Sequence, residues 1–227
     1  MSIQSIINVS NGLDMNRRKL VGIQYTRNEQ SKTSLTPTLN PWRFKVELPT
    51  VLRYSEARAI IEELDRLDRV YPETITFGNN PAMNWIFRYQ GVASTTQLNQ
   101  ITVQSFVGNQ LVLTNLPTIG STRTLFDAND LIQIGAFPHP FTSTTQVVRG
   151  TGTTVTVTTH RPNIFTTSVV GLGIKAGTNC EFRIFCPNMP TYKLTPGGSL
   201  YSGSTLINNA YLEWSDSFYL YEYMGDL

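Results

Sequence analysis

The sequence predicts a mainly β protein with a minor α+β part, and two observations carry this prediction. Apolar and polar residues alternate along residues 42–49, which is the pattern of a strand with one buried face. Residues 91–162 contain a series of short β-type runs separated by turn residues, whereas helical spacing of apolar residues is convincing only at residues 55–69. Many short strands with one helix indicate that β structure dominates.

The first strand and the helix follow each other closely. In residues 42–48 every second residue is apolar and the residues between are charged, so we expect a half-buried antiparallel strand that Pro49 ends. Ser55 is the expected N-cap of one amphipathic helix, whose outer face carries favourable charge pairs at i,i+4 spacing. Pro72 ends this region.

A small β-barrel of the OB or SH3 type is expected at residues 91–164. The candidate strands are residues 100–107, 110–114, 130–134, 145–149 and 153–159. Turn residues separate the first two runs and the last two, which predicts two hairpins. Asp127 or Asp130 is expected to accept hydrogen bonds from the backbone of the turn before the third run.

The pattern of residue types changes near residues 91 and 165, because the series of short β-type runs lies between them. This change predicts a division of the chain into domains. Residues 1–39 are rich in Ser, Asn, Gln and Thr, so we expect an N-terminal arm that orders mainly against neighbouring subunits. Residues 40–90 and 165–227 would form one discontinuous domain, with the barrel of residues 91–164 inserted in it. Within the second part, residues 187–204 are rich in Pro, Gly and Ser and predict an exposed loop.

Composition narrows the class of protein. Charged residues make up only 15% of the chain, against roughly 25% in an average soluble domain, and uncharged polar residues replace them. Such a surface suits a subunit that packs among copies of itself. The formal net charge of +2 is too small to indicate a specific nucleic-acid partner. No apolar run approaches the ~20 residues of a membrane span, so we expect no membrane partner and assembly in the cytoplasm.

Several short segments in a fixed order resemble the distal tail proteins of long-tailed bacteriophages. They are Trp-Arg-Phe at 42–44 with Leu-Pro at 48–49, Ser-Glu-Ala-Arg at 55–58, Ile-Thr-Phe at 75–77, Asp-Leu-Ile-Gln-Ile at 130–134 and His-Arg-Pro at 160–162. The resemblance spans residues 41–224. Proteins of that kind form a hexameric ring at the end of the tail tube through a "belt" domain, often with an attached small β-barrel. The resemblance implies that residues 42–48, 56–68 and 218–223 belong to the belt.

The function implied is that of a structural virion protein of the phage tail tip or baseplate. Its expected partners are copies of itself in a ring of six, together with the tail tube and the hub or fibre proteins. The alternative is a receptor- or carbohydrate-binding module at the particle surface, in which the barrel makes the contact. Aromatic and arginine residues are the usual anchors of protein interfaces, which selects five candidate interface residues. They are Trp42, Arg43, Tyr211, Trp214 and Tyr221.

No pattern in the sequence predicts catalysis, a cofactor or a metal. His139 lies between two prolines and His160 precedes Arg161, and loop or packing roles suit both better than a Ser-His-Asp site. Glu213 and Asp216 near Trp214 leave a glycosidase-like pair open as the least favoured interpretation. Cys180 and Cys186 lie roughly 20 Å apart if their segment is a strand, so we expect free, structural thiols.

Overall fold

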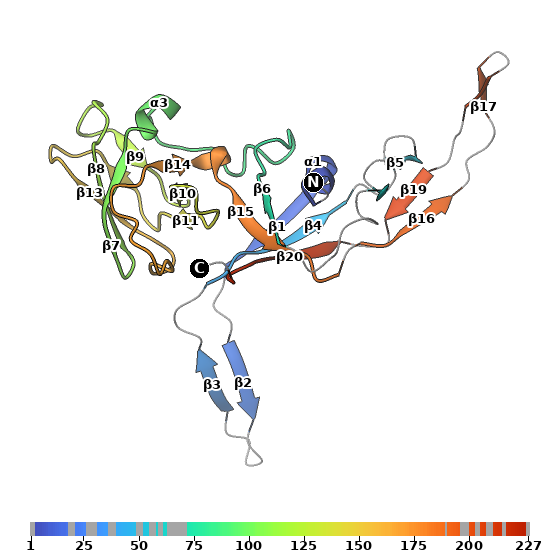
Figure 1. Cartoon of the computed structure of the whole chain (residues 1–227), viewed down its shortest axis with the longest axis horizontal. Helices are drawn as coiled ribbons and strands as arrows, with labels where there is room; N and C mark the ends of the chain where they lie inside the picture. The colour runs from blue at the N-terminus through green and yellow to red at the C-terminus, as the bar shows by residue number, and fades with distance from the viewer. Residues whose placement is uncertain are drawn as a thin grey trace.

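A computed structural model describes residues 3–17, 21–25, 31–35, 40–48, 52–54, 58, 61–62, 72–188, 190–195, 200–202, 205–207, 211–214 and 217–225. The protein is mainly β, as the sequence predicts, and it is built from several antiparallel sheets. Figure 1 shows two lobes side by side, with hairpins that extend away from them. Each lobe has its own buried hydrophobic core.

The first lobe is organised around a five-stranded antiparallel sheet in the order β1-β4-β20-β15-β6. Its strands are β1 (Gly12–Asn16), β4 (Arg43–Glu47), β20 (Phe218–Glu222), β15 (Phe182–Phe185) and β6 (Glu73–Ile75). The predicted alternation of β4 is confirmed, because Phe44 and Val46 are fully buried while Arg43 and Lys45 lie on the other face. The rings of Trp42, Phe44, Phe77 and Phe182 contact one another in this core.

The start of the chain contributes to the same core, where we had expected an arm that orders against neighbours. The helix α1 (Ile3–Val9) buries Ile3, Ile6 and Ile7, and its Gln4 side chain exchanges hydrogen bonds with the Thr76 backbone, each 2.8 Å long. The next segment, β1, pairs with β4 in register from Gly12 opposite Glu47 to Asn16 opposite Arg43. Apolar residues three and four apart at 3, 6 and 7 are the helix signal that the polar composition concealed.

Two hairpins and a small sheet extend from the first lobe (Figure 1). One hairpin pairs β2 (Val21–Tyr25) with β3 (Ser31–Leu35), and the other pairs β17 (Leu200–Ser202) with β18 (Thr205–Ile207). The small sheet has the order β16-β19-β5, with β16 (Tyr192–Thr195), β19 (Tyr211–Trp214) and β5 (Leu52–Arg53). Strands therefore occupy parts of residues 187–204 that were predicted to be a loop.

The second lobe consists of three small sheets around one core, and they do not close into the predicted barrel. The sheets are β13-β8-β7, β11-β10-β14 and β12-β9. Their strands are β7 (Thr102–Val107), β8 (Gln110–Thr114), β9 (Thr124–Phe126), β10 (Leu131–Ile134), β11 (Phe141–Thr142), β12 (Val147–Val148), β13 (Val155–Thr158) and β14 (Ile174–Ala176). Only isolated bridges, Thr102 to Gly173 and Ser143 to Thr159, link the two larger sheets. Single bridges replace the continuous ladders that closure requires.

Within this lobe, some local predictions are confirmed and others are wrong. The β7–β8 hairpin forms as expected, with Gly108 at φ +54° in its turn. The second expected hairpin does not form, because β12 pairs with β9 and β13 pairs with β8. Residues 81–87, between the two lobes, are turns. The short helix α3 (Thr95–Leu98), closed by a capping box from Ser94 and Gln97, was not predicted.

The two cores draw mainly on different parts of the chain. The second core begins at Ala93 but continues to Ala176, beyond the expected end at residue 164. A 3-10 turn, η1 (Gly177–Asn179), then leads into β15 of the first lobe. Most of the predicted helix at 55–69 lies outside the described residues. Of its described positions, Ile61 is buried, and exposed Arg58 pairs with Glu62 at 3.3 Å.

Candidate functional site: a buried ionic network and two exposed faces

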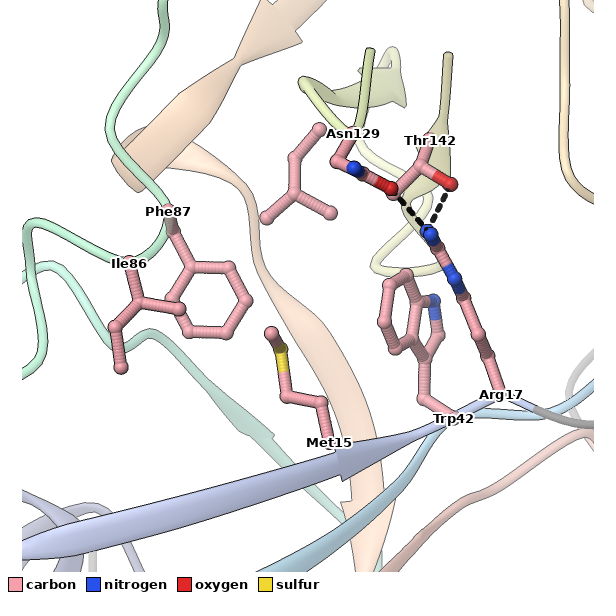
Figure 2. A pocket seen from close by; sticks show the side chains of 8 residues that line it. Met15, Arg17, Trp42, Ile86, Phe87, Asn129 and Thr142 are labelled. Carbon is pink, nitrogen blue, oxygen red and sulfur yellow. Dashed lines mark hydrogen bonds between the residues drawn. The ribbon is translucent and has the colours of Figure 1, made fainter. Parts of the chain in front are cut away.

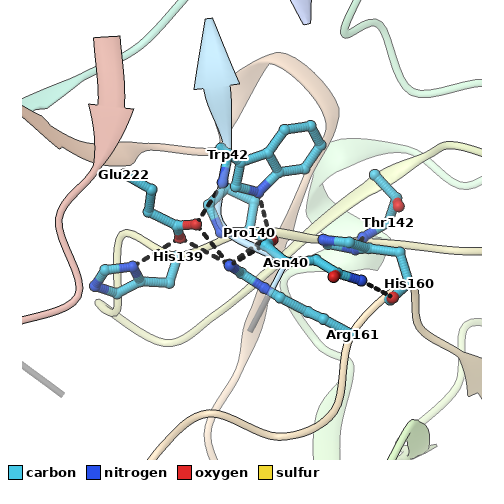
Figure 3. A network of polar contacts seen from close by, with 8 residues as sticks. All are labelled: Asn40, Trp42, His139, Pro140, Thr142, His160, Arg161 and Glu222. Carbon is cyan, nitrogen blue, oxygen red and sulfur yellow. Dashed lines mark hydrogen bonds and ion pairs between the residues drawn. The ribbon is translucent and has the colours of Figure 1, made fainter. Parts of the chain in front are cut away.

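A buried ionic network joins the two lobes (Figure 3). Glu222 comes from β20 of the first lobe, and Arg161 follows β13 of the second. The Arg161 Nη1 and Nη2 atoms lie 2.6 and 2.8 Å from the two carboxylate oxygens of Glu222, so the pair is bidentate. His139 Nδ1 lies 2.9 Å from Glu222 Oε1. Arg161 is 0% exposed and Glu222 is 4% exposed, so the whole contact is inside the protein.

Trp42 completes this network with two donated hydrogen bonds. Its backbone N–H donates to Glu222 Oε2 at 2.8 Å, and its indole N–H donates to the Pro140 carbonyl at the same distance. Arg161 Nη2 donates to that same carbonyl at 3.1 Å. Each bond named here gives a buried donor an acceptor, and the bonds from Arg161 and His139 to Glu222 and from the Trp42 indole to Pro140 cross from one lobe to the other. The buried Arg161 Nε has no acceptor among the described residues.

The network lowers the pKa of Glu222, and burial beside the network lowers the pKa of His160. Burial alone would raise the pKa of Glu222, but the Arg161 charge and the hydrogen bonds from His139, Arg161 and the Trp42 amide outweigh it and lower the pKa to about 2. Burial lowers the pKa of His160 to about 3, and the positive charges of Arg161 and Arg17 act in the same direction. His160 is therefore neutral at pH 7, with Nδ1 accepting a 3.0 Å hydrogen bond from the Thr142 backbone.

A cavity of about 350 Å³ lies beside the network, where the lobes meet (Figure 2). Its apolar wall comes from Met15, Ile86, Phe87, Leu131 and Trp42. At its polar rim, the Arg17 guanidinium lies over the Trp42 ring and donates to Thr142 Oγ1 and Asn129 Oδ1. Because both terminal nitrogens of Arg17 are paired within the chain, the described residues that line this cavity present no free charged group to a ligand.

The outer face of the five-stranded sheet, which we call the arginine face, gathers aromatic and charged residues. Its members are Asp14, Asn16, Arg43, Lys45, Phe185, Tyr219 and Tyr221. The Arg43 guanidinium lies over the Tyr219 ring at 4.6 Å and over the Tyr221 ring at 5.3 Å. The rings of Tyr221 and Phe185 are 5.8 Å apart. A hollow of about 260 Å³ opens between Arg43, Lys45 and Tyr219, so this face is neither flat nor closed.

The small sheet carries a second exposed face, which we call the glutamate face. Alternation along β19 buries Leu212 and Trp214 and leaves Glu213 exposed beside Tyr211. Lys193 of β16 lies opposite Glu213 in the strand register. This face is polar and charged, whereas the opposite face packs Trp214 against Tyr192 at a ring distance of 5.9 Å.

The five candidate interface residues thus lie in different environments. Arg43 and Tyr221 lie together on the arginine face, and Tyr211 lies on the glutamate face. Trp42 is only 2% exposed, and Trp214 is also buried, so both serve the core of their own chain. Whether any of the five touches a neighbour stays a prediction.

The residues considered for catalysis are separated. His139 is buried against Glu222, His160 is packed beside Trp42, and Glu213 is exposed on the small sheet, while Asp216 lies outside the described residues. Cys180 and Cys186 are buried free thiols, as predicted, and burial raises the pKa of Cys180 well above its usual value. Among the described residues, no cluster of His, Cys, Asp and Glu could hold a metal ion, and no helix has the length and apolarity of a membrane span.

The ionic network was not predicted from the sequence, although one signal pointed to it. Glu222 falls on the inward phase of β20, after buried Phe218 and Leu220. A carboxylate in line with core residues requires a buried partner. Nothing in the local sequence around residue 161 identifies that partner, because the two residues are 61 positions apart.

Comparison with known proteins adds no family to this description. The chain matches no protein-family model, and no curated protein matches it significantly. The likeness to phage distal tail proteins therefore rests on the order of short sequence segments alone.

Proposed function

We propose that this chain is a structural protein of a phage particle, a ring-forming subunit of the tail tip or baseplate that joins the tail tube to the hub or fibres. It would act in the virion after assembly in the host cytoplasm. The observation that carries this proposal is the pair of β-hairpins, β2–β3 and β17–β18, that extend from the first lobe (Figure 1).

Each of these hairpins forms a two-stranded sheet that pairs with no other described strand. An isolated two-stranded hairpin is at best marginally stable in water, because too few apolar groups are buried. In the sequence of β2, apolar Val21, Ile23 and Tyr25 alternate with Gly22 and Gln24, a pattern typical of a strand that packs against another layer. A neighbouring subunit supplies such a layer in a ring.

The arginine face supports the same proposal. Interface cores are enriched in arginine and tyrosine, and this face combines Arg43 with Tyr219 and Tyr221. By contrast, residues 91–164, all of which the structure describes, carry no exposed aromatic ring on which a sugar would stack. The alternative of a carbohydrate-binding second lobe is therefore less well supported.

The test is the native mass of the purified chain, measured by light scattering over a concentration series and paired with electron micrographs. We expect a closed oligomer with an integral mass, six-fold or three-fold, and ring-shaped particles. A chain that stays monomeric at every concentration and fails to co-sediment with phage tail tubes would overturn the proposal. Glycan binding on an array would then favour the binding module.

A further inference from the structure

Arg43 is a fixed cation without a carboxylate partner among the residues that the structure describes. The two tyrosine rings hold its guanidinium against the sheet, and none of the described residues forms a hydrogen bond or an ion pair with it. Its Nε–H group is shielded from solvent and has no acceptor. A guanidinium positioned in this way is prepared for a carboxylate, which its terminal N–H groups bind in a bidentate manner.

Glu213 is the exposed carboxylate that matches it. Of the other exposed acidic residues that the structure describes, Glu47 pairs with Lys45 at 3.6 Å and Glu62 pairs with Arg58 at 3.3 Å. Asp14 belongs to the arginine face itself, opposite Lys45. Glu213 lies on a different sheet and makes no ion pair with a described residue, although Lys193 is its neighbour in register.

The two faces are complementary in charge at two points. The arginine face presents Arg43 and, one strand away, the carboxylate of Asp14. The glutamate face presents Glu213 and, one strand away, the ammonium of Lys193. Apposed faces would therefore pair Arg43 with Glu213 and Asp14 with Lys193, while the Tyr211 ring meets the tyrosines of the arginine face.

We infer that the arginine face of one copy docks the glutamate face of a second copy, with Arg43 binding the Glu213 carboxylate. The inference rests on the proposed ring assembly and names the contact that closes it. Because two different surfaces of the chain meet, the contact is heterologous, and such contacts build rings when the rotation between copies closes. The small sheet lies to one side of the five-stranded sheet, which suits a contact with the next copy (Figure 1).

Charge reversal tests this contact by sedimentation velocity over a concentration series. We expect Arg43→Glu and Glu213→Arg each to weaken self-association by about 30-fold or more, because each brings like charges together. The double variant restores the opposite pairing and should recover most of the oligomer. Arg123→Glu makes the same charge change at an exposed arginine of the second lobe and should leave the oligomer unchanged.

The outcomes separate this inference from the proposed function. If the wild type forms rings but neither single reversal weakens them, or the double variant is not rescued, the Arg43–Glu213 contact is wrong and the ring assembly stands. If the wild type neither self-associates nor co-sediments with tail tubes, both fall. Circular dichroism of each variant checks that loss of association does not result from unfolding.

Discussion

The Glu222 carboxylate neutralises the only buried arginine among the described residues, so replacing it with glutamine leaves the Arg161 charge without a counterion. We expect Glu222→Gln to lower the free energy of unfolding by about 3–5 kcal/mol, the usual effect of removing one partner of a buried ion pair. Urea unfolding measures this change. Glu47→Gln, at an exposed ion pair of the same sheet, serves as the control and should cost less than about 1 kcal/mol. Equal effects of the two variants would contradict the role given to the network.

His160 makes stability depend on pH. Its pKa is about 3 in the folded protein and 6.5 in an ordinary environment, so the unfolded chain binds a proton that the folded chain rejects. The stabilisation is complete above pH 6.5 and is lost as the pH falls toward 3. We expect the free energy of unfolding to drop by about 2 kcal/mol between pH 7 and pH 5, and the slope to be smaller in His160→Gln. An unchanged slope in that variant would assign the acid sensitivity to other groups.

At the scale of single elements, the turn of the β7–β8 hairpin depends on the left-handed backbone of Gly108, at φ +54°. A side chain at this position has open space, so any loss of stability comes from the backbone alone. We expect Gly108→Ala to destabilise the protein by about 1 kcal/mol. Gly152→Ala is the matched change at a glycine without positive φ and should be neutral or slightly stabilising. Thermal unfolding of both variants gives the comparison.

Elements with a strong local pattern were predictable from the sequence, and those decided by distant partners were not. The alternation of β4 and the Gly108 turn follow from local chemistry, as does the hydrogen bond that Asp130 accepts from the Asp127 amide. The bond that Asp130 accepts from the Gln90 amide, 40 positions away, does not. The pairing of β12 with β9 depends on a strand more than twenty residues away, so the nearer hairpin partner was chosen wrongly. Residue type alone predicted two members of the arginine face, Arg43 and Tyr221. The same rule also selected Trp42, which is buried.

At the scale of the whole molecule, the ionic network should couple the unfolding of the two lobes. All three tryptophans, Trp42, Trp85 and Trp214, lie outside the second lobe. Tryptophan fluorescence therefore reports the first lobe and, through the Trp42 indole, its contact with Pro140, whereas circular dichroism reports both lobes. We expect the two signals to follow one transition in the wild type. In Glu222→Gln they should separate, because the link between the cores is weakened. Separate transitions in the wild type would show that the lobes are independent.

The chain enters the second lobe and returns from it to the first lobe at neighbouring points. The Phe87 and Phe182 rings, on either side of it, lie 5.9 Å apart, and a side chain at Gly177 would meet the Tyr89 backbone nitrogen at 2.7 Å. A segment whose two ends lie this close together can be replaced by another, for example through recombination, without a change in the strand order of the five-stranded sheet. What lies between positions 89 and 177 can thus change while the five-stranded sheet stays the same.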